Sequence, residues 1–257
     1  MLDMSVIAIV NQKGGVGKTT TAINLAATIA LAGKDILIID TDPQGNSTTG
    51  LGIEREGLKT LYDLYIGKAS PDEAISHTHV EHLDIIPSTI DLLGLEVELI
   101  EKENRERLLS LILTPLRDRY MYIFIDCPPS LSLLSLNALV ASDSVIIPVQ
   151  CEYYALEGLS LLLRTLQRVR NSFNPELDIK GILLTMFDPR NSLSHQVAAE
   201  VRRHFGDKVF KTVIPRNVTL GEAPSHGKPA ILYDIRSRGA QSYLSLAKEM
   251  LHENGFR

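Results

Sequence analysis

Two lysines, three glycines and two threonines stand close together between Lys13 and Thr20, in the order Lys-Gly-Gly-Val-Gly-Lys-Thr-Thr. Glycines let backbone N–H groups turn inward around phosphate oxygens, and the N-terminus of a following helix adds the positive end of its dipole. Lys18 is placed to reach the β- and γ-phosphates, and the Thr19 hydroxyl is placed to ligate Mg²⁺. We therefore predict a phosphate-binding loop made by Lys13, Gly14, Gly15, Val16, Gly17, Lys18, Thr19 and Thr20.

Three aspartates follow apolar runs and could serve metal and water chemistry. Asp126 ends the run Tyr122–Ile125 and could hold Mg²⁺ through water, although an aspartate capping the next turn has the same pattern. Asp40 and Asp42 follow the run Ile36–Ile39. Hydrolysis needs a group that orients the attacking water, and Asp42 is the candidate for that role. For Asp40, a position in the second shell of Mg²⁺ and a purely structural role stay equally open.

These residues must be positioned by a sheet, because continuous apolar runs alternate with helical patterns along the whole chain. Strands are predicted at Val6–Val10, Ile36–Ile39, Leu83–Pro87, Tyr122–Ile125, Ser144–Val149, Ile179–Thr185 and Val209–Ile214, and helices at Thr20–Ala32, Arg105–Asp118, Leu131–Ala141, Leu156–Phe173, Leu193–Phe205 and Gly239–Glu253. This alternation predicts an α/β fold: a doubly wound, mostly parallel sheet with helices on both faces. No linker interrupts the pattern, so residues 1–257 are expected to form one domain.

In such sheets ligands bind beyond the carboxyl ends of the strands. The loop at Lys13–Thr20 and the three aspartates all follow strands, so we expect them at one edge. Glu152, Asp188 and Arg190 also follow predicted strands and are expected at the same edge.

Composition and charge exclude several classes of protein. No apolar run reaches the roughly 20 residues of a membrane span. The two cysteines, Cys127 and Cys151, form no C-x-x-C motif, which favours a reducing cytosol. The net charge of −5 argues against a general nucleic-acid binder, but residues 1–150 carry −9 and residues 151–257 carry +4. This asymmetry permits a basic face in the C-terminal part, and it is equally compatible with an ordinary mix of surface charges.

The phosphate-binding loop departs from the common form G-x-x-x-x-G-K-[ST], because Gln12 stands where the first glycine belongs. With Lys13 before a glycine pair, it resembles the deviant loop K-G-G-x-G-K-[ST] of the ParA/MinD superfamily of ATPases. The resemblance implies that Lys13 crosses a dimer interface to the phosphates bound by the other subunit. It also implies that Asp42 lies in a switch region and assists hydrolysis, and that Pro215 and Asn217 contact adenine.

The resemblance extends over nearly the whole chain and is closest to chromosomal ParA of the Soj type. Matching segments are Asp126–Ser130, Pro148–Gly158, Glu222–Pro229 and Tyr233–Gly239. It implies ATP and Mg²⁺ as ligands, a weak ATPase stimulated by a ParB (Spo0J) centromere-binding protein, an ATP-dependent homodimer that binds double-stranded DNA non-specifically, and a cytoplasmic, nucleoid-associated protein without a membrane partner. No helix-turn-helix extension precedes the loop, so operator binding is not expected.

The DNA surface implied by the resemblance involves basic residues of the C-terminal half. Arg190 matches one of these positions, whereas Thr219 stands where a relative has arginine. Further candidates, each of which could also be an ordinary surface charge, are Lys211, Arg216, Lys228, Arg236 and Arg238. Phosphate contacts predict steep salt dependence and little sequence preference.

Two other functions share the deviant loop. A MinD-like membrane-cycling ATPase would need a basic amphipathic C-terminal helix, whereas the tail Leu246–Gly255 is short and mixed in charge, and is expected to be a docked helix with a glycine stop. An iron–sulfur reductase of the nitrogenase iron-protein type would need cysteines at a dimer axis, whereas Cys127 and Cys151 are expected to be buried. The histidines of Ser76–His82 are expected at the surface rather than in a metal cluster.

Overall fold

The computed structural model describes residues 4–253, and within them the chain forms a sheet of eight strands in the order β3-β4-β2-β5-β1-β6-β7-β8. The strands are β1 (Ser5–Ile9), β2 (Ile36–Asp40), β3 (Ser76–His77), β4 (Leu83–Ile86), β5 (Tyr122–Asp126), β6 (Ser144–Gln150), β7 (Asp178–Phe187) and β8 (Val209–Pro215). All neighbouring strands are parallel except β3, which pairs antiparallel with β4. The central strands β2 and β5 are buried along their whole length, which is why their sequences are continuously apolar up to the final aspartate.

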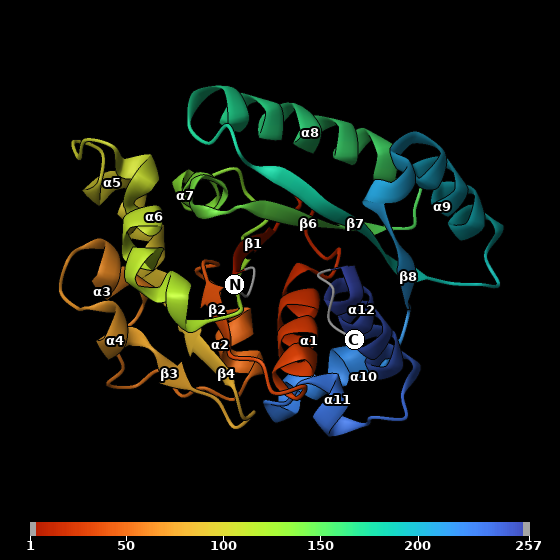
Figure 1. The fold of residues 1–257 in the computed structure, drawn as a ribbon, viewed down its shortest axis with the longest axis horizontal. Helices are drawn as coiled ribbons and strands as arrows, with labels where there is room; N and C mark the ends of the chain where they lie inside the picture. The colour runs from red at the N-terminus through yellow and green to blue at the C-terminus, as the bar shows by residue number, and fades with distance from the viewer. Residues whose placement is uncertain (1–3, 254–257) are drawn as a thin grey trace.

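Helices cover both faces of this sheet (Figure 1). The α-helices are α1 (Lys18–Ala30), α2 (Asn46–Gly50), α3 (Leu61–Tyr65), α4 (Pro71–Ala74), α5 (Leu95–Glu98), α6 (Leu108–Leu113), α7 (Leu133–Ala141), α8 (Ala155–Ser172), α9 (Ser192–Phe205), α10 (Thr219–Glu222), α11 (Ala230–Tyr233) and α12 (Arg238–Glu253). Short 3₁₀ helices lie at Ile90–Gly94, Arg105–Arg107, Thr114–Arg119, Gly206–Lys208 and Ala223–His226.

Successive residues of β1 point to opposite faces and so belong to two hydrophobic cores. Val6 and Ala8 join the core that also contains residues of α7 and α8, whereas Ile7 and Ile9 join the core with α1 and α12. The period of two follows from the pleat of a strand. In Figure 1 α7 and α8 lie on one side of the central strands, and α1 and α12 on the other.

The strand order places the ends of β1, β2 and β5 beside one another. β5 pairs with β1 on one side and with β2 on the other. From β1 the chain crosses to β2 and β4, and later returns to β6, β7 and β8 on the opposite side. The order therefore changes direction next to β1, where an open α/β sheet leaves a crevice for a ligand.

The predicted α/β sheet is confirmed, and each of the seven predicted strands is present. β3 was missed, because two residues carry no periodic signal. The single helix predicted over Arg105–Asp118 is wrong: it is divided into a 3₁₀ turn, α6 and the 3₁₀ helix Thr114–Arg119. Pro115 explains the second break, since it has no N–H to continue the α-helical hydrogen bonds.

The C-terminal helix α12 docks on α1 and β8, as expected for Leu246–Gly255 as far as residue 253; the glycine stop at Gly255 lies outside the described residues. Leu246 and Met250 are fully buried on its inner face. Residues 4–253 include no helix with both the length and the apolarity to cross a membrane.

Candidate active site

The loop between β1 and α1 is held from two neighbouring strands. The Asn11 side chain accepts a hydrogen bond from Lys13 N (3.0 Å) and donates one to the Pro148 carbonyl of β6 (2.7 Å). Thr185 of β7 donates its hydroxyl to the Val16 carbonyl (2.8 Å). These bonds fix the loop from outside its concave side. The loop shape is therefore set before any ligand is bound.

The turn into α1 needs glycine at two places. Gly15 has φ 73° and Gly17 has φ 92°, backbone angles that a residue with Cβ adopts only with strain. Gly17 is the N-cap of α1 and offers no side chain to its first turn. Amide groups of that turn thus keep their hydrogen-bonding capacity for an anion, and the helix dipole favours the same ligand.

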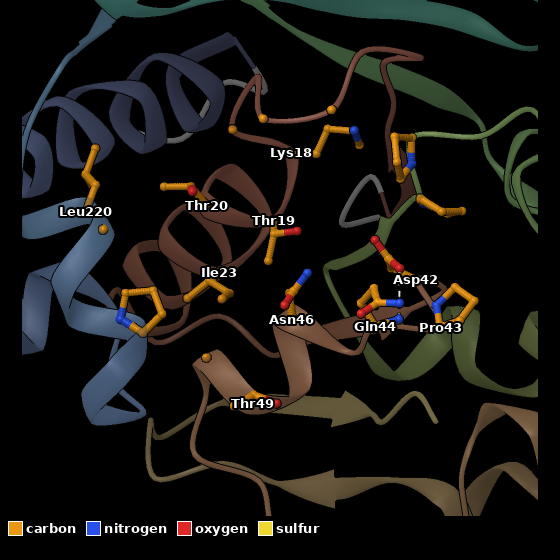
Figure 2. A pocket seen from close by; sticks show the side chains of 18 of the residues that line it. Lys18, Thr19, Thr20, Ile23, Asp42, Pro43, Gln44, Asn46, Thr49 and Leu220 are labelled. Carbon is orange, nitrogen blue, oxygen red and sulfur yellow. Dashed lines mark hydrogen bonds between the residues drawn. The ribbon is translucent and has the colours of Figure 1, made fainter. Parts of the chain in front are cut away.

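Lys18 lies beneath the loop with only 7% of its surface exposed. Its Nζ donates to the Lys13 carbonyl at 3.1 Å. Burial lowers the pKa of this ammonium, and the negative charges of Asp126 and Asp42 oppose that change. Figure 2 shows Lys18 and Thr19 on the same side of the pocket. A phosphate in the loop would replace a contact with a neutral carbonyl by a stronger one between opposite charges.

Asp126 and Asp40 are register partners at the ends of β5 and β2. Asp126 Oδ2 accepts from Ser47 Oγ at 2.7 Å, whereas its Oδ1 is buried without a hydrogen-bond partner. Burial raises the pKa of Asp126 to about 6, and the hydrogen bond from Ser47 and the nearby Thr19 hydroxyl oppose that shift. A buried carboxylate oxygen without a partner, next to a threonine hydroxyl, suits a hard cation that binds oxygen. The residues present therefore fit Mg²⁺.

Asp40 is fully buried and its oxygens are held by donors of the chain itself. Oδ2 accepts from Thr48 N (2.8 Å) and Thr48 Oγ1 (2.7 Å), and Oδ1 accepts from Asp42 N (3.2 Å). Burial and the neighbouring charge of Asp126 raise the pKa of Asp40 to about 7. Asp40 thus fixes the start of α2 and the backbone of Asp42. These contacts are those of a structural carboxyl group and leave a second-shell role as a prediction.

Asp42 lies on the wall of the pocket and, in Figure 2, points toward Thr19. Its Oδ1 accepts from Gln44 N at 2.9 Å, and its carbonyl accepts from Ser88 Oγ at 2.5 Å. These bonds hold Asp42 in place, whereas its Oδ2 accepts no hydrogen bond from the residues that the structure describes. That geometry allows Asp42 to accept a hydrogen bond from a water molecule in the pocket.

The pocket has a volume of about 880 Å³ and combines a polar end with an apolar one. Its lining residues are Gly14, Gly15, Gly17, Lys18, Thr19, Thr20, Ile23, Asp42, Pro43, Gln44, Asn46, Thr49, Gly50, Leu93, Pro128, Pro129, Ser130, Met186, Leu220, Gly221, Pro224 and Ser225. In Figure 2 Leu220 lies across the pocket from Asp42, with Thr20 and Ile23 between. A phosphate chain at the loop and an apolar ring near Leu220 are the two parts of a nucleotide.

Comparisons with known proteins agree with this geometry. A family model described as an AAA domain matches residues 4–179. The sporulation initiation inhibitor protein Soj of Bacillus subtilis is 58% identical over 246 residues, which covers 95% of this chain and 97% of that protein. The chromosome partitioning protein ParA of Caulobacter vibrioides is 54% identical over 251 residues, covering 96% of this chain and 94% of that one. The chain belongs to the ParA/Soj family of P-loop ATPases.

A solved structure agrees on the ligands. Cobyrinic acid a,c-diamide synthase from Mycobacterium smegmatis, with bound ATP analog and magnesium, has a TM-score of 0.86 and 34% identity, covering 97% of this chain and 95% of that one. This ParA/Soj-family protein is thus an ATP hydrolase whose ligands are ATP and Mg²⁺. No group of three His, Cys, Asp or Glu side chains surrounds one metal position in residues 4–253. Such a group of side chains is not required for Mg²⁺, because hydroxyl, water and phosphate oxygens can complete its coordination.

Lys13, the additional lysine of the ParA/Soj loop, does not line the pocket of its own chain. Its half-exposed side chain forms an ion pair with Glu152, which follows β6. The sequence predicts Glu152 at the carboxyl edge of the sheet but does not indicate Lys13 as its partner. In its own chain the Lys13 ammonium is thus paired with Glu152 and is not part of the pocket wall.

Pro215 and Asn217 are not among the lining residues of the pocket. Asn217 Oδ1 is buried without a hydrogen-bond partner. The apolar wall consists instead of Ile23, Met186, Leu220 and Pro224, none of which was singled out from the sequence. Of these four residues, only Pro224 lies in a segment that the sequence marks, because Glu222–Pro229 matches the family. Contacts of Pro215 and Asn217 with adenine stay a prediction.

The basic residues considered for DNA lie in three places. Arg190 is 88% exposed and donates Nε and Nη2 to the two carboxylate oxygens of Asp188, both at 3.0 Å. This pair lowers the pKa of Asp188 to about 2. Arg216 N donates to the Phe187 carbonyl, so Arg216 lies at the same strand ends as Arg190. The other exposed candidates are Lys211 on β8 and Lys228, Arg236 and Arg238 around α11 and α12.

Other groups lie where the sequence analysis expected. Cys127 and Cys151 are buried free thiols, and burial raises the pKa of Cys151 to about 11. His77 pairs with Asp84, and His82 pairs with Asp35, at the surface.

Proposed function

We propose that this ParA/Soj ATPase is a chromosome or plasmid partitioning switch. The observation that carries the proposal is the arrangement of Lys18 and Thr19 in the pocket wall with the buried Asp126 next to them, in a chain that aligns with partitioning proteins over nearly its whole length. ATP binding would assemble a dimer that holds DNA non-specifically, and hydrolysis would release it. Residues 1–257 would act as one ATPase domain.

In the bound state the loop amides and Lys18 neutralise charge on the β- and γ-phosphates. Thr19 would ligate Mg²⁺, and the unpaired Oδ1 of Asp126 would hold it through water. The metal supplies charge neutralisation at the phosphates. Asp42 orients the attacking water, while Asp40 fixes the Asp42 backbone. Pro215 and Asn217 contact the adenine.

A second copy completes the site through Lys13. ATP γ-phosphate presented by the partner would compete with Glu152 for the Lys13 ammonium, since both are anions. Full hydrolysis would then occur only in the dimer. A ParB-type centromere-binding protein would stimulate that step.

The DNA-binding face would be formed by Arg190 and Arg216 at the ends of β7 and β8, together with Lys211, Lys228, Arg236 and Arg238. Dimerisation doubles the number of phosphate contacts, so a weakly basic monomer can bind DNA once it is paired. This supports association with the nucleoid rather than with a membrane.

The decisive experiment is DNA binding by the purified chain with ATP, with ADP and without nucleotide, each at low and high salt, with sedimentation to measure dimerisation. The proposal expects ATP-specific binding by a dimer, weakened steeply by salt. Dimerisation without DNA binding would contradict it. Vesicles of anionic lipid, run in parallel, test the MinD-like alternative, and iron and sulfide analysis tests the reductase alternative.

A further inference from the structure

Arg55 contacts the segment that follows Asp42 through hydrogen bonds to its residues 44–49. Its Nη2 donates to the Gly45 carbonyl at 2.7 Å, to the Thr49 hydroxyl at 2.8 Å and, more weakly, to the Gln44 carbonyl at 3.3 Å. Among the side chains that the structure describes, no acidic group forms an ion pair with Arg55. The guanidinium is therefore used on backbone and hydroxyl oxygens of one short segment.

Gly45 lets the guanidinium come this close. It has φ 64°, and a Cβ placed on it would lie 2.7 Å from Arg55 Cζ. That distance is shorter than any real Cβ contact, so only glycine allows Arg55 to lie against this backbone. Gly45 is also the N-cap of α2, whose Ser47 and Thr48 hold Asp126 and Asp40.

The loop that carries Arg55 is itself fixed at several points. Leu51 and Thr60 are buried on either side of it, and Ile53 N donates to the Thr48 carbonyl at 3.1 Å. Gly52 packs against Gly227, close in sequence to Pro224 and Ser225 of the pocket wall. Arg55 is thus anchored to the body of the protein and not only to the segment that it holds.

We propose that Arg55 is a positioning residue for ATP hydrolysis, which fixes residues 44–49 and thereby the orientation of the Asp42 carboxylate toward the attacking water. Gln44 connects the two: its carbonyl accepts from Arg55, and its N–H donates to Asp42 Oδ1. This role rests on the proposed hydrolytic function of Asp42. Lysine at position 55 keeps the positive charge but carries it on a shorter side chain than that of Arg55, whose Nη2 makes all three contacts, so it replaces only part of them.

The test is steady-state ATP hydrolysis by Arg55→Gln and Arg55→Lys, with Arg107→Gln as the matched control. Arg107 also donates to a carbonyl, that of Phe173 at 3.3 Å, but it does not line the nucleotide pocket. We expect kcat to fall about tenfold in Arg55→Gln with KM for ATP within about twofold, and an intermediate kcat in Arg55→Lys. Arg107→Gln should match the wild type.

A second measurement separates positioning from general stability. In an Asp42→Ala background, adding Arg55→Gln should leave single-turnover hydrolysis unchanged, because the effect acts through Asp42. The same fold reduction in both backgrounds would overturn the role. Amide hydrogen exchange of Gly45 and Thr49 should accelerate in Arg55→Gln, and unchanged exchange would also contradict it.

The results of these hydrolysis assays distinguish a failure of the Arg55 role from a failure of the proposed function. If the wild-type chain hydrolyses ATP and Arg55→Gln has an unchanged kcat, only the role of Arg55 is overturned. If the wild-type chain does not hydrolyse ATP, the proposed function is overturned together with it.

Discussion

The buried pair Asp40 and Asp126 makes a definite prediction about stability without nucleotide and Mg²⁺. Burial raises the folded-state pKa of Asp40 to about 7 and that of Asp126 to about 6, from an ordinary value of 3.8. Between the ordinary pKa of 3.8 and these raised values, the folded state binds more protons than the unfolded chain. The free energy of unfolding therefore falls as pH rises through this window, in contrast to a salt-bridged carboxylate.

The size of the effect follows from the pKa values. Each pKa unit corresponds to about 1.4 kcal/mol, so raising the pH from about 5.5 to about 8 should cost on the order of 2 kcal/mol for Asp40 and about 1 kcal/mol for Asp126. Adding Mg²⁺ and ATP should reverse the loss, because the ligands compensate the buried negative charge.

The assay is urea unfolding at several pH values in the presence of a chelator. The contribution of His82 must be removed from the comparison, because its hydrogen bond to Asp35 raises the pKa of His82. The stability that this bond contributes is also lost as pH rises. We therefore specify a His82→Gln background, with and without Asp40→Asn. The pH slope should persist in His82→Gln and decrease when Asp40→Asn is added. A flat profile in His82→Gln, or an equal slope in both, would refute the reasoning.

Three further predictions concern named residues. Asp42→Ala should lower kcat at least about a hundredfold and leave ATP-driven dimerisation intact, as measured by hydrolysis and sedimentation; a normal turnover rate would exclude Asp42 as the water-orienting group. Arg190→Glu should abolish ATP-dependent DNA binding while Arg203→Glu, an equal charge change on α9, largely preserves it; equal losses would remove Arg190 from the DNA surface. Gly45→Ala should destabilise the chain by about 1 kcal/mol more than Gly57→Ala, because both have positive φ but only Gly45 contacts Arg55; equal losses in urea unfolding would argue against a constraining contact.

The sequence was sufficient to predict those parts of the fold and of the site that a single local pattern determines. The strand, the glycines and the helix around Lys18 all lie within one short stretch, and mainly apolar runs marked every strand except β3. The carboxyl-edge rule then brought Asp40, Asp42 and Asp126 to the same place from the order of elements alone.

The rest depends on contacts between distant segments. Met186, Leu220 and Pro224 form one wall of the pocket but come from β7, α10 and a 3₁₀ turn, and each is an ordinary residue in its own stretch. Glu152 gains significance only because β6 lies beside β1, which brings it to Lys13. Neither pairing has a local pattern that could predict it, and the break at Pro115 was missed because the apolar period continues across it.

The short helix α2 links the chemical parts of the site. Ser47 donates to Asp126 and Thr48 donates to Asp40, so both buried carboxylates are bound to the same turn. The residues before that turn hold Asp42, and its outer side is held by Arg55. If Asp42 orients the attacking water as proposed, the proposed metal position and that carboxylate are joined through one short helix, and Arg55 contacts the same helix.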